Sequence, residues 1–174
     1  MEHPQTLLTV RGLSKSFPGV QALKDVDFDL HRGEVHAVVG ENGAGKSTLM
    51  RIIAGICPAD TGSMELAGQP YSPCNRAVAE RQGVRMVMQE LNLVANLTIA
   101  ENLFLGRIPT RLGVIRYRQM NAQAGELMQR MGMTNLDPTI PIGRLSVGQQ
   151  QLVEIAAALA SRFHLLILDE PTAS

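Results

Sequence analysis

Hydrophobic and polar residues alternate in two short stretches near the start of the chain, at residues 7–10 and 26–30. Alternation with a period of two places every second side chain on the same face of a β-strand. Gly12 and the Pro18-Gly19 pair lie between the two stretches, and glycine and proline at such points favour turns. The pattern therefore predicts two short antiparallel strands at the N-terminal end of the chain.

A strand, a glycine-rich loop and a helix are predicted next, in that order. The apolar run at residues 34–39 ends at Gly40 and predicts a buried strand. After the loop, residues 47–54 carry apolar side chains at helical spacing, and Gly55 is a typical stop signal for that helix. The apolar positions of the helix are Leu49, Ile52 and Ile53.

The middle of the chain changes to mainly helical patterns. Short apolar strands are expected at residues 63–66 and 84–88, before helical patterns at residues 99–107 and 120–133. We therefore expect the stretch 93–161 to form a small helical subdomain.

The last part of the sequence predicts a capped helix followed by a strand. Ser146 and Gln149 have the spacing of a capping box, which marks the first turn of a helix. The aliphatic run at residues 165–168 predicts a strand buried on both faces of a parallel sheet, and Asp169 and Glu170 follow it directly. The helix is expected to bury one apolar face, made up of Leu152, Ile155, Ala156 and Leu159.

The composition is typical of a soluble globular protein. With 174 residues, 45% of them hydrophobic and 18% charged, the chain is long enough for one domain with a sizeable core. Its 16 basic and 16 acidic residues cancel, so no overall positive field attracts nucleic acid or anionic lipid. We therefore expect no nucleic-acid partner.

Cysteine usage and hydropathy indicate a cytoplasmic protein. Cys57 and Cys74 have neither metal-ligand spacing nor the density of a disulfide framework, as expected in a reducing compartment. No apolar run reaches the roughly 18 residues that a membrane span requires, and residues 1–6 are too polar for a signal peptide.

Residues 40–47 match the phosphate-loop pattern G-x-x-x-x-G-K-[ST] at every fixed position, between a predicted strand and a predicted helix. Small residues let successive backbone amides turn toward phosphate oxygens, and the following helix presents its positive N-terminal end. Lys46 is expected to reach the β and γ phosphates, and Ser47 to bind a bridging magnesium ion. The alternative is a glycine turn beside a surface lysine. The candidate nucleotide-binding residues are Gly40, Glu41, Asn42, Gly43, Ala44, Gly45, Lys46, Ser47 and Thr48.

Two adjacent carboxylates, Asp169 and Glu170, follow the last predicted strand at the carboxyl edge of the sheet, where ligands of parallel sheets bind. Asp169 suits the coordination shell of magnesium, and Glu170 suits polarising the water that attacks the γ phosphate. The alternative is a solvated acidic pair that ends a strand.

Together with the phosphate loop, three further features resemble the ATP-binding cassettes of ABC transporters. Residues 145–151, with the sequence LSVGQQQ, look like the family signature. Gln89 occupies the position of the family's Q-loop glutamine, and residues 169–174 match the segment after its second nucleotide motif. The resemblance covers essentially the whole chain and implies an α/β P-loop NTPase core with an N-terminal antiparallel β portion and an inserted helical subdomain.

The resemblance also implies roles for particular residues. Gln89 would contact magnesium or the attacking water, and Ser146 and Gly148 would act on the nucleotide bound by a second cassette. Phe17 lies where cassettes carry an aromatic residue that stacks on adenine, and the alternative for Phe17 is an ordinary core phenylalanine. The implied catalytic residues are Glu170, Gln89 and Lys46, and the implied metal ligands are Ser47, Gln89 and Asp169.

A finer resemblance is to the cassettes of simple-sugar importers of the ribose, galactose and xylose type. It rests on residues 16–20, 40–47, 89–93 and 101–107 and on the signature that contains Val147. In that group one polypeptide usually carries two cassettes, so this chain would be the first cassette, ending before the family's switch histidine. The implied domain is a single incomplete ATP-binding domain over residues 1–174, with a nucleotide-binding core at 1–92 and 162–174 and a helical subdomain at 93–161.

Partners and location follow from the resemblance in the same way. ATP and Mg²⁺ would bind between this cassette and a second one, present in tandem or as a homodimer. Transmembrane permease subunits would bind the cassette at the cytoplasmic face of the inner membrane, with a periplasmic or extracellular solute-binding protein acting indirectly. The alternatives are a non-transport cassette ATPase associated with ribosomes or DNA, and a nucleotide-binding fragment without hydrolysis.

Overall fold

The computed structural model describes residues 5–88, 92–160 and 163–169. The chain divides into two compact units, Met1–Arg85 and Met86–Ser174. Strands and helices occur in both units, in agreement with the expected α/β class.

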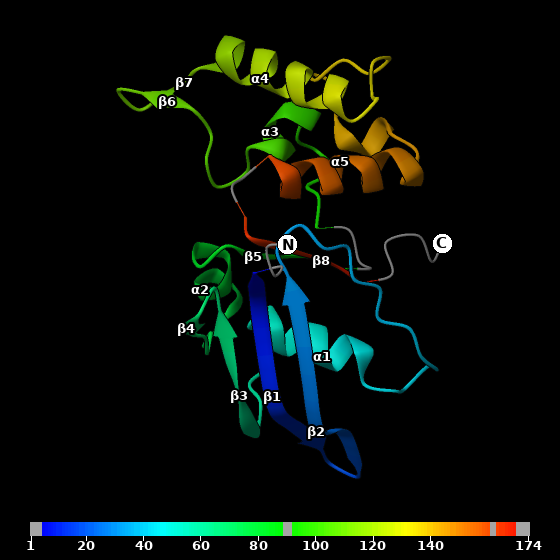
Figure 1. Cartoon of the computed structure of the whole chain (residues 1–174). Coiled ribbons are helices and arrows are strands. Elements are labelled where there is room, and N and C mark those ends of the chain that lie inside the picture. Colours follow the sequence, from blue (N-terminus) through cyan, green and yellow to red (C-terminus); the bar gives the residue numbers. More distant parts are fainter. Residues whose placement is uncertain (1–4, 89–91, 161–162, 170–174) are drawn as a thin grey trace. The chain divides into compact units, whose positions relative to one another are not determined.

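The first unit contains an antiparallel sheet of β1 (Thr6–Phe17), β2 (Val20–His31), β3 (Thr61–Leu66) and β4 (Gln69–Pro70). The strand order is β2-β1-β3-β4 (Figure 1). β1 and β2 are longer than the predicted strands, because shifts of register at several points let the pairing continue through irregular positions. The prediction of two antiparallel strands at the N-terminal end is confirmed.

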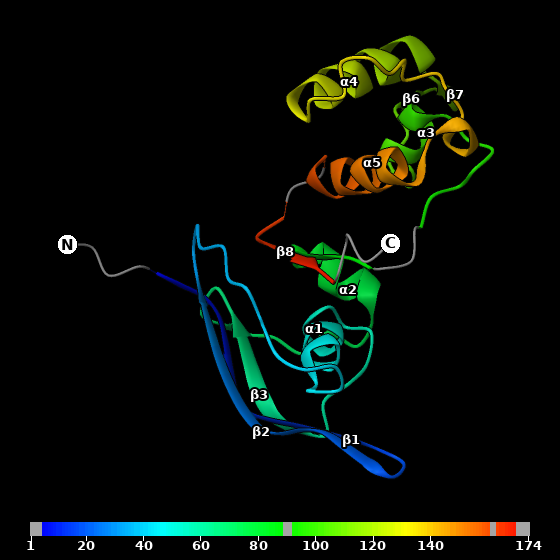
Figure 2. The same ribbon diagram turned by 90° about the vertical axis from the view of Figure 1, so that its right-hand side faces the viewer.

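α1 (Lys46–Ile53) lies against one face of this sheet and contacts β2 (Figure 2). The helix stops at Gly55, whose φ of 69° is in the left-handed region that glycine adopts without the steric cost of a Cβ atom. The backbone N–H of Ile56 then donates to the carbonyl of Arg51 at 2.8 Å. The predicted helix and its stop signal are confirmed, and its buried side chains are the expected Leu49, Ile52 and Ile53.

Tyr71 binds the C-terminal end of α1. Its side chain is buried, and its hydroxyl donates a hydrogen bond of 2.6 Å to the backbone carbonyl of Ile53. The carbonyls in the last turn of a helix have no partner within the helix, so this bond satisfies one of them. Burial raises the pKa of the Tyr71 hydroxyl above its ordinary value, which keeps it protonated as a donor.

We expect Tyr71→Phe to lower the free energy of unfolding by about 1 to 3 kcal/mol, because it leaves the buried carbonyl of Ile53 without its donor. Tyr117→Phe is the matched control, since Tyr117 is the chain's other tyrosine and is 52% exposed. Urea unfolding followed by circular dichroism measures both variants. Equal unfolding midpoints would contradict the role of Tyr71.

Residues 34–39 differ from the prediction, because the structure gives them no strand. Val35 is 99% exposed and Val39 is 90% exposed, so the run is not buried either. A strand is stable only where a neighbour satisfies its backbone hydrogen bonds, and none of the strands in the described residues pairs with this run. The prediction was wrong because the sequence pattern indicates apolar character but not the partner of a strand.

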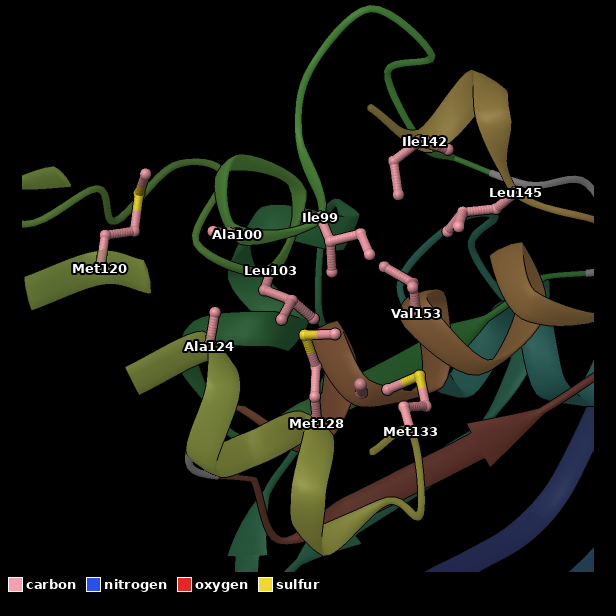
Figure 3. Packing of buried hydrophobic residues seen from close by; sticks show 11 residues of the cluster. Ile99, Ala100, Leu103, Met120, Ala124, Met128, Met133, Ile142, Leu145 and Val153 are labelled. Atoms are coloured by element: carbon pink, nitrogen blue, oxygen red, sulfur yellow. The ribbon is translucent and has the colours of Figure 1, made fainter. Parts of the chain in front are cut away.

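The second unit is built around α3 (Ile99–Leu103), α4 (Tyr117–Arg130) and α5 (Val147–Leu159), which contact one another. Their apolar side chains meet in one buried cluster (Figure 3). α3 is shorter than predicted because the chain turns at Gly106, where φ is 79°. The cluster consists of Ile99, Ala100, Leu103, Met120, Ala124, Met128, Met133, Ile142, Leu145, Val153 and Ala156.

Short elements complete the description. α2 (Arg76–Arg81) precedes β5 (Val84–Val87), which pairs with β8 (Leu165–Leu168) in a two-stranded sheet. β6 (Thr110–Arg111) and β7 (Val114–Ile115) form a hairpin, and a 3-10 helix spans Ile142–Arg144. The predicted strands at residues 84–88 and 165–168 are therefore present. The boundaries of the expected helical subdomain, 93–161, stay a prediction.

The buried face of α5 differs from the predicted one. Leu152 is 41% exposed and Leu159 is 37% exposed, whereas Val153 and Ala156 are fully buried in the cluster with α3 and α4. Apolar residues occupy so much of this helix that two neighbouring stripes both fit the helical period. Packing against the other helices selected the stripe with Val153, so the prediction was wrong for Leu152 and Leu159.

β8 is less buried than predicted. Ile167 is 5% exposed, but Leu168 is 47% exposed. A strand is covered on both faces only in a wider sheet with helices on each side, and within the described part of the chain β8 pairs only with β5. The prediction of a strand was right, and the prediction of burial on both faces was wrong.

Arg107 joins the ends of two helices in this unit. Its guanidinium donates to the carbonyl of Leu103 at 3.0 Å and to the carbonyls of Ala157 and Ala160 at 3.3 and 2.8 Å. The last turn of α5 contains no basic residue, so Arg107 supplies the positive charge that a helix C-terminus favours. One side chain therefore holds the C-terminal ends of α3 and α5 together.

Candidate functional site

The glycine-rich loop at residues 40–47 leads directly into α1. Gly43 and Gly45 have φ values of 86° and 88°, so both use the left-handed conformation that favours glycine. Gly45 is the N-cap of α1, no side chain caps the helix, and no acidic residue lies in its first turn. The N-terminal end of α1 therefore carries its partial positive charge without a carboxylate of its own to neutralise it.

Gly45 also lies too close to β2 for any other residue. A Cβ atom at this position would clash with the carbonyl oxygen of Ala22 and lie 2.8 Å from Cδ2 of Leu23. A Cβ atom at Gly43 would meet no atom within 4 Å. The loop therefore rests on β2 at Gly45 and extends into solvent at Gly43.

Lys46 folds back across the loop that precedes it. Its Nζ donates hydrogen bonds of 2.7 and 2.8 Å to the carbonyls of Gly40 and Glu41. The loop is also closed by a hydrogen bond of 3.2 Å from the backbone N–H of Ala44 to the carbonyl of Glu41. Ser47 and Thr48 follow, half-buried, in the first turn of α1. The ammonium group is thus held at the mouth of the loop.

Phe17 ends β1 near the same loop. Leu23, which lies beneath Gly45, pairs with Lys15, and Phe17 is two residues farther along β1, or about 7 Å. The Phe17 side chain is 45% exposed, which contradicts the alternative of an ordinary core phenylalanine. Its ring centroid is 5.6 Å from Nζ of Lys15.

The position of Lys15 is fixed by an ion pair. Its Nζ lies 2.7 Å from Oδ1 of Asp60, and Oδ2 of Asp60 accepts a hydrogen bond of 2.7 Å from the backbone N–H of Ser16. The hydrogen bond from Lys15, followed by that from Ser16, lowers the pKa of the Asp60 carboxyl below its ordinary value. These contacts fix the end of β1 that carries Phe17.

In the second unit, Asp169 follows β8 at the point where β5 also ends. Its backbone N–H donates to the carbonyl of Val87 at 3.1 Å, so the carboxyl ends of the two strands meet. Gln89 and Glu170 lie outside the described residues. In the sequence they come two residues after Val87 and directly after Asp169.

Ser146 and Gly148 lie at the exposed N-terminal end of α5. The capping box is present, with 3.3 Å from the backbone N–H of Gln149 to Oγ of Ser146 and 2.9 Å from the N–H of Ser146 to Oε1 of Gln149. A Cβ atom at Gly148 would meet nothing within 4 Å, and the first turn has no acidic residue. The predicted helix cap is confirmed.

The sequence pattern gave no individual role to three polar residues of this unit that the structure shows to be buried or bound to a buried group. Asn102 and Glu154 are 5% and 9% exposed, and Asn92 donates to Glu154. Glu154 is a single carboxylate in the apolar second half of α5, and that isolation was the signal that could have revealed it.

Within residues 5–88, 92–160 and 163–169 there is no group of three or more His, Cys, Asp or Glu residues that could hold a metal ion. Among the described helices, none has the length and apolar character needed to cross a bilayer.

Known proteins resemble this chain over nearly its whole length. The sequence model of the family described as ABC transporter matches residues 23–173. The galactofuranose transporter ATP-binding protein YtfR of Escherichia coli is 50% identical over 98% of this chain and 34% of its own length. The ribose import ATP-binding protein RbsA of Chromobacterium violaceum is 48% identical over 96% of this chain and 33% of its own length. The chain thus spans about a third of the length of these relatives.

Among solved structures, the ADP conformation of MJ1267, an ATP-binding cassette of an ABC transporter, has a TM-score of 0.83 and 25% sequence identity. The similarity covers 97% of this chain and 70% of that one.

Proposed function

This chain belongs to the ABC transporter family, and on that premise we propose that it binds and hydrolyses ATP to drive the import of a solute, a simple sugar. The observation that supports the proposal most directly is the glycine loop resting on β2 in front of an uncapped, positively charged helix end. That arrangement suits phosphate, because backbone amides and a helix N-terminus both favour anions.

In the proposed nucleotide complex, residues 40–48 surround the phosphates and Phe17 stacks on the adenine ring. Lys46 gives up its hydrogen bonds to the two loop carbonyls and donates to oxygens of the β and γ phosphates. These oxygens are stronger acceptors because they are charged. Mg²⁺ suits the oxygen donors of Ser47, Gln89 and Asp169, and when bound it would neutralise charge on the phosphates.

Hydrolysis in this proposal depends on Gln89 and Glu170, which follow β5 and β8 in the sequence. Glu170 polarises the attacking water, and Gln89 orients it. Ser146 and Gly148, at the exposed N-terminal end of α5, bind the γ phosphate of a nucleotide held by a second cassette. This second cassette is either a tandem domain of the same polypeptide or another copy.

The proposed partners are a second cassette, transmembrane permease subunits and, indirectly, a periplasmic or extracellular solute-binding protein. Sugar as the solute, and a peripheral position at the cytoplasmic face of the inner membrane, are supported by relatives named as galactofuranose and ribose transport ATP-binding proteins. Copurification of the full-length protein with a polytopic membrane protein would support this assignment, whereas copurification with ribosomes or DNA would contradict it.

We expect Lys46→Ala to weaken binding of Mg-ATP by about 10- to 100-fold, because it removes charge-assisted hydrogen bonds worth about 1.5 to 3 kcal/mol. Isothermal titration of the full-length protein measures the affinity. Lys24→Ala is the matched control, since Lys24 is exposed on β2. If wild-type protein takes up no Mg-ATP, or if both variants bind equally well, the proposed function is wrong.

A further inference from the structure

The hairpin of β6 and β7 ends in an exposed apolar residue, and Figure 1 shows the hairpin projecting past the N-terminal end of α4. Leu112 and Gly113 form its two-residue turn, with φ values of 52° and 79°. Two positive φ values in succession are typical of a type I′ turn, which asparagine and glycine favour. Leu112 places a branched apolar side chain there, and this side chain is 97% exposed. The left-handed conformation of Leu112 therefore has a steric cost that no burial within the described chain offsets.

The sequence around this turn is basic. Residues 102–125 contain four arginines and neither aspartate nor glutamate, although the whole chain has a net charge of zero. Three of these arginines are exposed, and we call Arg111, Arg116 and Arg118 the hairpin arginines. Among the residues that the structure describes, no carboxylate forms an ion pair with any of the three. Their positive charge therefore faces solvent.

The register of the hairpin places two of these arginines beside the apolar turn. Arg111 pairs with Val114, and the backbone N–H of Arg116 donates to the carbonyl of Pro109 at 2.9 Å, which continues the pairing. Because side chains alternate between the two faces of a strand, Arg111, Val114 and Arg116 lie on the same face. Val114 is 69% exposed. One face of the hairpin thus carries two cations and an aliphatic side chain, and Leu112 lies at its end.

The first turn of α4 also departs from what a helix favours. Arg116 is the N-cap of α4 and makes no capping hydrogen bond with its side chain, and the first turn contains no acidic residue. Arg118 lies in that turn, where the positive end of the helix disfavours a cation. Local preferences therefore disfavour Leu112, Arg116 and Arg118 at their positions. Such departures are expected where residues serve a function other than folding.

We propose that this hairpin binds the surface of a bilayer that contains anionic lipids. Leu112 and Val114 insert at the boundary between head groups and acyl chains, where exposed apolar side chains of basic surface elements are buried. The hairpin arginines bind lipid phosphates, because a guanidinium group can donate two parallel hydrogen bonds to a phosphate. The charge of the hairpin is thus complementary to that of the lipid.

The size of this surface favours a bilayer over a protein partner. Its apolar part is one turn residue and one strand residue, whereas a specific protein interface buries about 800 Å² on each partner around a packed core. Anionic lipid requires no such shape, because it attracts nearby arginines through its surface potential. The proposed function brings the cassette to the membrane through permease subunits, and on that basis the hairpin adds a direct, reversible contact with lipid.

Cosedimentation of the full-length protein with lipid vesicles, without nucleotide, tests this proposal. We expect wild type to bind vesicles of equal parts phosphatidylglycerol and phosphatidylcholine at least about tenfold more tightly than vesicles of phosphatidylcholine alone. Leu112→Asn should weaken binding to the anionic vesicles by about tenfold, because no apolar side chain then inserts at the turn. Asparagine suits the left-handed conformation, so the turn itself is kept.

Two further comparisons separate the hairpin from the rest of the surface. Arg111→Gln should weaken binding to the anionic vesicles by about fivefold, the effect of one arginine close to such a surface. Arg130→Gln is the matched control, because Arg130 is exposed at the other end of α4, and it should change binding by less than about twofold. Leu112→Trp should bind at least as tightly as wild type, because tryptophan favours the membrane interface.

Three results would overturn the lipid contact. The first is equal binding of wild type to both kinds of vesicle, and the second is an equal effect of Arg111→Gln and Arg130→Gln. The third is a Leu112→Asn variant that binds vesicles like wild type but copurifies less well with permease subunits, which would assign the hairpin to a protein partner. Because the vesicles are tested without nucleotide, a failure to bind Mg-ATP would refute the proposed function and leave the measurement of lipid binding intact.

Discussion

Gly45→Ala is expected to weaken ATP binding by more than about 100-fold, which corresponds to about 2.7 kcal/mol. The substitution also forces a side chain into the left-handed conformation, at a cost of about 1 to 2 kcal/mol. The new Cβ atom would clash with the carbonyl of Ala22 and press on Leu23, so the loop must leave β2. The backbone amides and Lys46 would then no longer be held in front of α1.

Gly43→Ala is the matched control, because Gly43 has nearly the same φ but an added Cβ would meet no protein atom. It carries the conformational cost of about 1 to 2 kcal/mol without displacing the loop from β2. Isothermal titration with Mg-ATP and thermal unfolding of both variants separate the two effects. Equal loss of affinity in both would show that the contact between Gly45 and β2 is not what shapes the loop.

Glu170→Gln is expected to reduce ATP turnover by about 100-fold or more while leaving ATP affinity unchanged, because an amide cannot act as a general base. Affinity should persist because the proposed phosphate contacts lie in the loop and in the first turn of α1. Single-turnover phosphate release from the full-length protein measures the effect.

Glu65→Gln provides the comparison for this variant, since Glu65 is an exposed glutamate of β3. Turnover that survives in Glu170→Gln would refute the general-base role. A parallel loss of ATP binding would place Glu170 among the binding residues.

The features that could be predicted from the sequence are those fixed by neighbouring residues. The spacing of Leu49, Ile52 and Ile53 defines the buried face of α1, and Gly55 ends that helix by its own conformation. The capping box of Ser146 and Gln149 is likewise local, since both partners lie in one turn. Such features appear in the structure as predicted.

The features that could not be predicted depend on partners distant in sequence. Residues 34–39 have the composition of a strand, but a ladder partner decides whether a strand forms. Packing against α3 and α4 determines that Val153, and not Leu152, is buried on α5. The buried position of Glu154 could not be predicted because its hydrogen-bond donors belong to Asn92, and the pattern of a helix contains no information about a residue so distant in sequence.

The two hydrogen bonds from Lys46 to the loop carbonyls have a consequence for selectivity among ligands. A molecule that enters the loop must outcompete two neutral carbonyl acceptors for the same ammonium group. Water, sugars and other uncharged compounds offer acceptors no stronger than those carbonyls, whereas a polyphosphate offers several charged oxygens at once. We therefore expect the loop to prefer polyanions to uncharged molecules, whichever base or sugar the polyanion carries.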